Sequence, residues 1–151
     1  MVDDTSDLVA LRQRIDQVDQ RLLELISERA RCAQDVAAVK AKSGDPAYYR
    51  PEREAQVLRS VMARNQGPLS DEEVARLFRE IMSACLALEE PVRVAFLGPE
   101  GTFTQEAALK HFGHSALSQP LAAIDEVFRE VQAGAASYGV VPIENSTEGV
   151  V

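Results

Sequence analysis

The sequence is poor in cysteine, in clustered basic residues and in long apolar runs. Its two cysteines, Cys32 and Cys85, fall within helical apolar patterns, which indicates small core residues of a reducing compartment rather than a disulfide framework. No apolar run is long enough to span a bilayer, and no signal-peptide pattern is visible. The formal net charge of −8, without a basic block, argues against nucleic acid as a partner. These features predict a cytoplasmic protein.

The stretch from Leu8 to Lys40 lacks glycine and proline and carries apolar residues in two columns of a seven-residue repeat. Such a repeat predicts one long helix with an apolar seam. At about 1.5 Å per residue, this helix is roughly 50 Å long, so it needs other helices or a second chain to cover its seam. The columns are Leu8, Ile15, Leu22, Arg29, Val36 and Leu11, Val18, Leu25, Cys32, Val39.

Arg29 breaks this apolar seam, and Lys40 follows it by three turns on nearly the same face. Two readings remain open: Arg29 packs its stem and extends its head into water, or the two cations form a buried site for a small anion. Arg12 lies 17 residues before Arg29, about 25 Å away along the helix, so one small ligand cannot touch both within one chain. If Arg12 shares the site, it comes from a partner subunit.

Three helices are predicted before Pro91. Ser70 and Glu73 form a capping box at the start of the third. The expected limits are Ser6 or Asp7 to Ser43, Pro51 to the segment 65–68, and Ser70 to Pro91. Three helices around one long rod leave apolar surface uncovered, so we expect an intertwined homodimer.

After Pro91 the pattern alternates between strands and helices, which predicts a right-handed parallel α/β unit. The expected elements are a strand at 92–97, a helix at 102–112, a weak strand at 116–118, a helix at 124–133 and a strand at 138–141. Three parallel strands leave edges and faces uncovered, so we expect the opening of a larger domain. We therefore expect two domains, an all-helical one at residues 1–90 and an incomplete α/β one at residues 91–151.

Both parts resemble known families. The first is similar to the all-helical chorismate mutases, and the second resembles the start of prephenate dehydratases, so the series resembles the bifunctional enzymes of phenylalanine biosynthesis. The first resemblance rests on Leu11-Arg12, Ile15-Asp16, Asp19, Leu22-Leu23, Leu25-Ile26, Glu28-Arg29, Val39-Lys40 and 49–54. The second rests on the segments 94–104 and 140–146.

The resemblance implies an all-α three-helix domain that rearranges chorismate to prephenate without metal or cofactor. It implies that Arg29 and the partner subunit's Arg12 hold the two substrate carboxylates and that Lys40 faces the ether oxygen. It further implies roles for three more residues. Arg53 supports the site, Glu54 accepts from the substrate hydroxyl, and Glu89 is a second donor to the ether oxygen.

Two positions depart from that family. Arg50 stands where some relatives carry an Asp near the hydroxyl, and Cys85 replaces a small hydroxyl residue. In the dehydratase part, Glu144 and Asn145 are implied to lie in the cleft of a periplasmic-binding-protein-like α/β lobe. The Thr-containing catalytic motif of that family is absent, so we expect no dehydratase activity from these residues alone.

A second class of function uses the same seam. A non-catalytic helical dimerisation module joined to a ligand-binding lobe would also need a long apolar helix. Such a module gains little from Arg29 and Lys40 on one inner face with Glu54 and Glu89. These residues therefore favour the enzyme.

Overall fold

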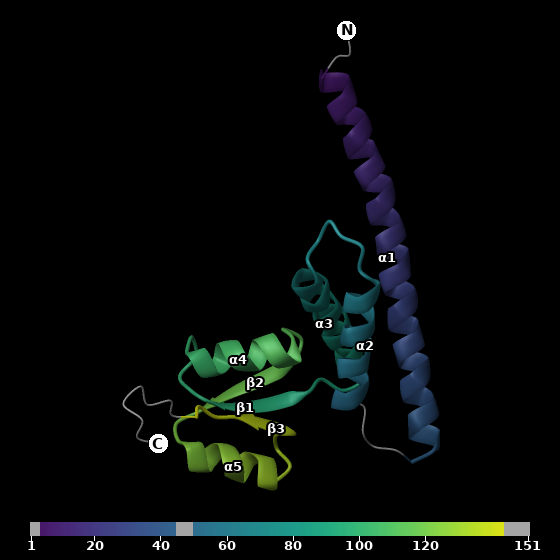
Figure 1. The fold of residues 1–151 in the computed structure, drawn as a ribbon. Helices are drawn as coiled ribbons and strands as arrows, with labels where there is room; N and C mark the ends of the chain where they lie inside the picture. Colours follow the sequence, from purple (N-terminus) through teal and green to yellow (C-terminus); the bar gives the residue numbers. More distant parts are fainter. Residues whose placement is uncertain (1–3, 45–49, 144–151) are drawn as a thin grey trace.

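The structure, a computed structural model, describes residues 4–44 and 50–143. Its first element is a single long helix, α1, from Asp4 to Lys42 (Figure 1). The predicted cap at Ser6 or Asp7 is wrong, because both residues lie inside the helix. Asp4 and Asp7 instead place negative charge in the first turn, at the positive end of the helix dipole. Lys40 and Lys42 place positive charge in the last turn, at its negative end, and both interactions stabilise the helix.

Helices α2, Pro51–Arg64, and α3, Asp71–Ala87, confirm the other two helical predictions. Proline occupies the first turn of α2, where its missing N–H costs no hydrogen bond. The hydroxyl of Ser70 accepts a hydrogen bond of 3.2 Å from the backbone N–H of Glu73, as the capping box predicts. Helix α3 packs against both α1 and α2, so it is the centre of the helical part.

The N-terminal half of α1 extends past α2 and α3 without cover from the rest of the chain (Figure 1). Its apolar residues are between 41% and 60% exposed, as for Leu25 at 60% and Ile15 at 57%. Cys32 is also exposed, so within one chain the prediction that both cysteines are core residues holds only for Cys85. These residues therefore form a long stripe of exposed apolar surface.

The second part is a parallel three-stranded sheet with one helix on each face (Figure 1). The strand order is β2-β1-β3, which confirms the predicted parallel sheet, although the middle strand along the chain is longer than expected. The elements are β1 Arg93–Leu97, α4 Phe103–Phe112, β2 Leu117–Leu121, α5 Ile124–Gln132 and β3 Tyr138–Val140.

Successive residues of β1 point to opposite faces of the sheet and contribute to two small hydrophobic cores. Val94 packs with Ala108 of α4 on one face, and Ala95 packs with Val127 of α5 on the other. Leu86 of α3 packs against the first of these clusters. The α/β unit therefore rests on the same helix that organises the helical part.

No helix among the described residues combines the length and apolarity needed to cross a membrane. The residues at the end of the chain, including Glu144 and Asn145, lie outside the described residues, so the predicted dehydratase cleft stays a prediction.

Candidate active site

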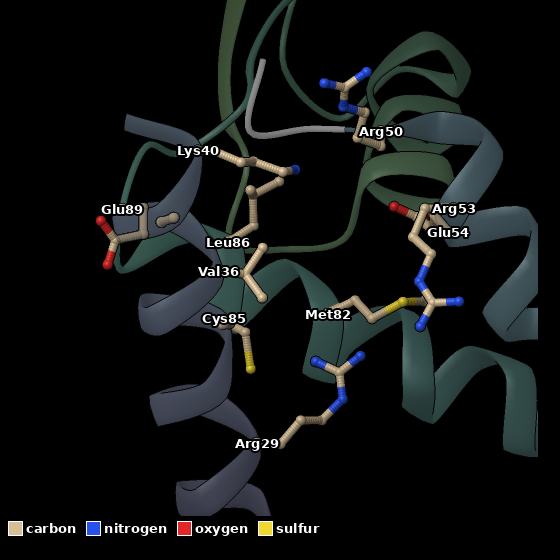
Figure 2. Close-up of a pocket in the computed structure, with 12 residues that line it drawn as sticks. Arg29, Val36, Lys40, Arg50, Arg53, Glu54, Met82, Cys85, Leu86 and Glu89 are labelled. Carbon is tan, nitrogen blue, oxygen red and sulfur yellow. The ribbon is translucent and has the colours of Figure 1, made fainter. Parts of the chain in front are cut away.

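A cavity of about 230 Å³ lies where α1, α2 and α3 meet (Figure 2). It brings together seven of the eight residues predicted for the mutase site, although their roles remain predictions. The lining residues are Arg29, Ala33, Val36, Ala37, Lys40, Arg50, Arg53, Glu54, Met82, Cys85, Leu86 and Glu89.

Helix α1 supplies one wall through a single stripe of side chains. Ala33, Val36 and Ala37 lie between Arg29 and Lys40 at spacings of three or four residues, which places them on one face. Ala37 is buried, and the two cations are half-buried. The small alanines leave room for the cavity, and the cations stand at its two ends along the helix.

Helix α2 supplies polar groups from its first turn. Arg50 precedes Pro51, and Arg53 and Glu54 follow it. Arg53 is exposed and donates a hydrogen bond of 2.9 Å from Nη1 to Oε1 of Gln56, which holds its head near the rim. The side chain of Glu54 is only 18% exposed, so its carboxylate lies inside the helical packing.

The ionisation of Glu54 depends on two opposing effects. Burial raises the pKa of this carboxyl group above its ordinary value, and the positive charge of Arg79 on α3 lowers it in part. The Nε atom of Arg79 lies 3.8 Å from Oε1 of Glu54. Arg79 thus lies next to Glu54 but does not line the cavity.

Helix α3 closes the cavity with Met82, Cys85 and Leu86, which again follow helical spacing. Cys85 is 5% exposed and presents a small, weakly polar group to the cavity. Glu89 follows the end of the helix, and its backbone N–H donates to the carbonyl of Leu86 at 3.1 Å. In Figure 2 its carboxylate points outward from the labelled cluster, whereas Lys40 extends its ammonium into it.

The cavity is more positive than the chain around it. Its lining contains four cationic residues, Arg29, Lys40, Arg50 and Arg53, and two acidic ones, Glu54 and Glu89, although the chain carries a net charge of −8. A partly buried group of cations is costly without anions. The arrangement therefore suits a small ligand with two negative charges.

Arg12 is the one predicted mutase residue that the structure keeps apart. It lies on the exposed N-terminal half of α1, about 25 Å from Arg29 at the rise of an α-helix. Within residues 4–44 and 50–143, no three His, Cys, Asp or Glu side chains are placed to hold a metal ion.

Sequence reasoning missed two features of this site. Arg79 was not singled out, although it precedes Met82 by three residues and Leu86 by seven, a spacing that places it near the wall they form. Tyr138 of β3 was not connected with the site either. Burial raises the pKa of its phenol, and the charges of Glu52 and Glu54 raise it further, so Tyr138 lies near enough to the start of α2 to feel these carboxylates.

Comparison with known proteins matches two families along the chain. Residues 11–90 match the chorismate mutase type II family, and residues 94–151 match the prephenate dehydratase family. A chorismate mutase structure (form I) from Thermus thermophilus shares 38% identity and a TM-score of 0.51, covering 52% of this chain and 98% of that one.

Longer relatives bear names that combine the two families. The bifunctional chorismate mutase/prephenate dehydratase of Pseudomonas aeruginosa is 69% identical over 152 residues, which cover 98% of this chain and 42% of that protein. The protein of the same name from Neisseria gonorrhoeae is 52% identical over 144 residues, covering 95% and 39%. The chain thus spans about two fifths of the length of these curated relatives. It belongs to the chorismate mutase type II family, and this domain is followed by part of a prephenate dehydratase domain.

Proposed function

We propose that the cavity between α1, α2 and α3 converts chorismate to prephenate in phenylalanine biosynthesis, in the cytoplasm. One observation carries this proposal: Arg29, Lys40, Arg50 and Arg53 line a single small cavity within the stretch that matches the chorismate mutase type II family. Chorismate is a dicarboxylate, and a cavity with an excess of cations neutralises its two negative charges. The proposed boundary with the dehydratase part lies near Pro91.

The chemistry explains why such a cavity needs no nucleophile, metal or cofactor. The rearrangement is pericyclic, so the protein has to hold the substrate in a compact conformer. It also has to place donors where the ether oxygen gains negative charge in the transition state. Cations on a largely apolar wall of Ala33, Val36 and Met82 meet both requirements.

In this proposal Arg29 holds one substrate carboxylate, and Lys40 donates to the ether oxygen from the other end of the same wall. Glu54 accepts from the substrate hydroxyl, and Arg53 supports the site from the rim. Glu89, when protonated, is a second donor to the ether oxygen once its side chain turns inward. Arg50 and Cys85 complete the lining as the two departures from the family pattern.

The second carboxylate requires Arg12, which we propose comes from a partner subunit in an intertwined homodimer. The support is the exposed apolar stripe of α1, on which Leu11, Ile15 and Leu22 are 50% or more exposed. A second copy laid along this stripe covers it and brings Arg12 of the partner subunit toward the cavity. Each site is then built from two chains.

The alternative is a helical dimerisation module without catalysis. Both proposals give a dimer, so the deciding experiment is a spectrophotometric assay of chorismate loss by the purified chain, with prephenate quantified as product. The mutase proposal gives turnover that Arg29→Ala abolishes. A folded, dimeric protein that leaves chorismate unchanged contradicts it. We expect no turnover of prephenate by this chain.

A further inference from the structure

Arg79 of α3 lies next to Glu54 of α2, where these two helices pack together. Its Nε atom is 3.8 Å from Oε1 of Glu54, and the side chains of Arg79 and Glu54 are 27% and 18% exposed. Arg79 lines a different space, the groove between α3 and α4, and not the candidate active site. Any effect that Arg79 has on the mutase site therefore passes through Glu54.

The geometry of this pair favours attraction over hydrogen bonding. A separation of 3.8 Å is too long for an N–H···O hydrogen bond. The Nε atom of Arg79 is buried and has no hydrogen-bond partner among the described residues. Arg79 thus stabilises negative charge on Glu54 without occupying its lone pairs, which stay available to a substrate hydroxyl.

Burial works against that negative charge. It raises the pKa of Glu54, and Arg79 is the charged group that opposes this effect most directly. Tyr138 of β3 lies on the same side and stays neutral near pH 7, because burial and then the charges of Glu52 and Glu54 raise its pKa. The other charged groups around Glu54 are Arg29 and Lys40 on α1, and Arg50, Glu52 and Arg53 at the start of α2.

We propose that Arg79 is a positioning residue for the mutase site, which keeps Glu54 a carboxylate turned to accept a hydrogen bond from the substrate hydroxyl. This role rests on the proposed function of the cavity. Arg79 does not line the cavity, so we expect its removal to act through the charge and orientation of Glu54.

Arg76 provides a matched control on the same helix. It lies three residues before Arg79 and lines the same groove, but its Nη2 atom pairs with Oε2 of Glu73 at 2.9 Å. Both side chains of that pair are more than half exposed. Arg76→Gln therefore removes the same charge from the same helix without changing the surroundings of Glu54.

The test compares the whole chain with Arg79→Gln, Arg79→Lys and Arg76→Gln, measuring kcat and KM for chorismate from pH 5 to 8.5. In Arg79→Gln the acid limb of kcat/KM moves to higher pH by about one unit, the shift expected from losing a neighbouring opposite charge. Arg79→Lys restores most of the profile, and Arg76→Gln matches the unchanged protein. A purely structural role for Arg79 lowers activity equally at every pH.

A second measurement keeps the proposal independent of turnover. The side-chain carboxyl of Glu54 is titrated by carbon NMR in the unchanged chain, Arg79→Gln and Arg76→Gln, with Glu54→Gln to assign the signal. A midpoint that rises only in Arg79→Gln supports the proposal, and superimposed titrations overturn it. If the unchanged chain has no mutase activity but the midpoint still rises, the proposed function fails while the coupling of Arg79 to Glu54 stands.

Discussion

His114 binds both oxygens of the Glu80 carboxylate: its Nδ1 lies 2.8 Å from Oε1, and its backbone N–H donates to Oε2 at 3.1 Å. Glu80 belongs to α3, whereas His114 follows α4 in the α/β unit. This contact, with Leu86 packed on the sheet, joins the two parts of the chain through the helix that also closes the candidate active site.

The first prediction concerns this contact. Burial works to raise the pKa of Glu80, but the hydrogen bonds and charge of His114 lower it below its ordinary value. Because the folded pKa is the lower one, the stabilisation is present above the ordinary carboxyl pKa and is lost as pH falls through the folded value. The His114 side chain is 71% exposed, so His114→Ala should lower the free energy of unfolding by only about 0.5–1 kcal/mol.

Urea unfolding at pH 6 and at pH 3.5 measures this loss. The difference between His114→Ala and the unchanged chain should shrink at the lower pH. Arg129→Ala, which removes an exposed pair with Asp125 within α5, is the control and should change stability little at either pH. A difference that grows on acidification contradicts the assignment.

The second prediction concerns Gly113, which stands where the α/β unit touches α3. Its φ is +82°, and an added Cβ would lie 2.4 Å from the Cβ of Ser83. Gly101 has a nearly equal φ of +83° with nothing within 4 Å, so Gly101→Ala meets the strain of a positive φ without a steric clash. Gly113→Ala should cost about 1–3 kcal/mol more than Gly101→Ala, because only the former overpacks.

Chemical denaturation of both variants measures that difference. Ser83→Gly removes the atoms that the new methyl group meets, so the extra cost of Gly113→Ala should largely disappear in a Ser83→Gly background. Equal losses in the free energy of unfolding for Gly113→Ala and Gly101→Ala would show that the contact between Gly113 and Ser83 accommodates the methyl group without cost.

Sequence patterns predicted the secondary structure and the cavity wall because both depend on local spacing. The stripe from Arg29 to Lys40, the proline at the start of α2 and the capping box at Ser70 are all visible within a few turns of chain. The start of α1 was placed too late, since its acidic first turn stabilises an earlier start than the apolar pattern indicates.

Relations between distant segments could not be predicted in this way. The spacing of Tyr138 does not indicate that its phenol lies near Glu52 and Glu54, because that proximity follows from how the two parts of the chain pack together. The helical position of Arg79 is visible in the sequence, but its pairing with Glu54 depends on how α2 and α3 pack. Cys32 shows the same limit: it lies in α1 as the apolar pattern predicts, but its side chain is exposed in the single chain.

The third prediction concerns Lys40. If Lys40 donates to the ether oxygen in the transition state, Lys40→Ala should lower kcat and kcat/KM together, by about 3 kcal/mol in activation free energy. Lys42→Ala is the matched control, because it removes an exposed lysine from the same final turn of α1. Steady-state kinetics with chorismate distinguish the cases, and a rise in KM alone would make Lys40 only a binding residue.

The fourth prediction concerns Glu89. An ionised carboxylate only accepts hydrogen bonds, whereas an amide also donates. Glu89→Gln supplies a permanent donor of similar shape and should raise kcat near neutral pH and flatten its pH profile. Glu90→Gln, on the exposed neighbour, should leave the profile unchanged. Identical profiles for the Glu89 variant and the unchanged chain would show that Glu89 does not serve the ether oxygen.

The most direct test of a mutase site shared between two chains is subunit complementation. Arg12→Ala and Arg29→Ala proteins are mixed in equal amounts, and chorismate loss is measured after subunit exchange has been verified. Half of the dimers are then mixed, and each mixed dimer has one site with both arginines, so about one quarter of the unchanged activity should return. A mixture of Arg29→Ala and Lys40→Ala should stay inactive, because both residues line the cavity of one chain. No recovery from the first mixture would contradict the shared site.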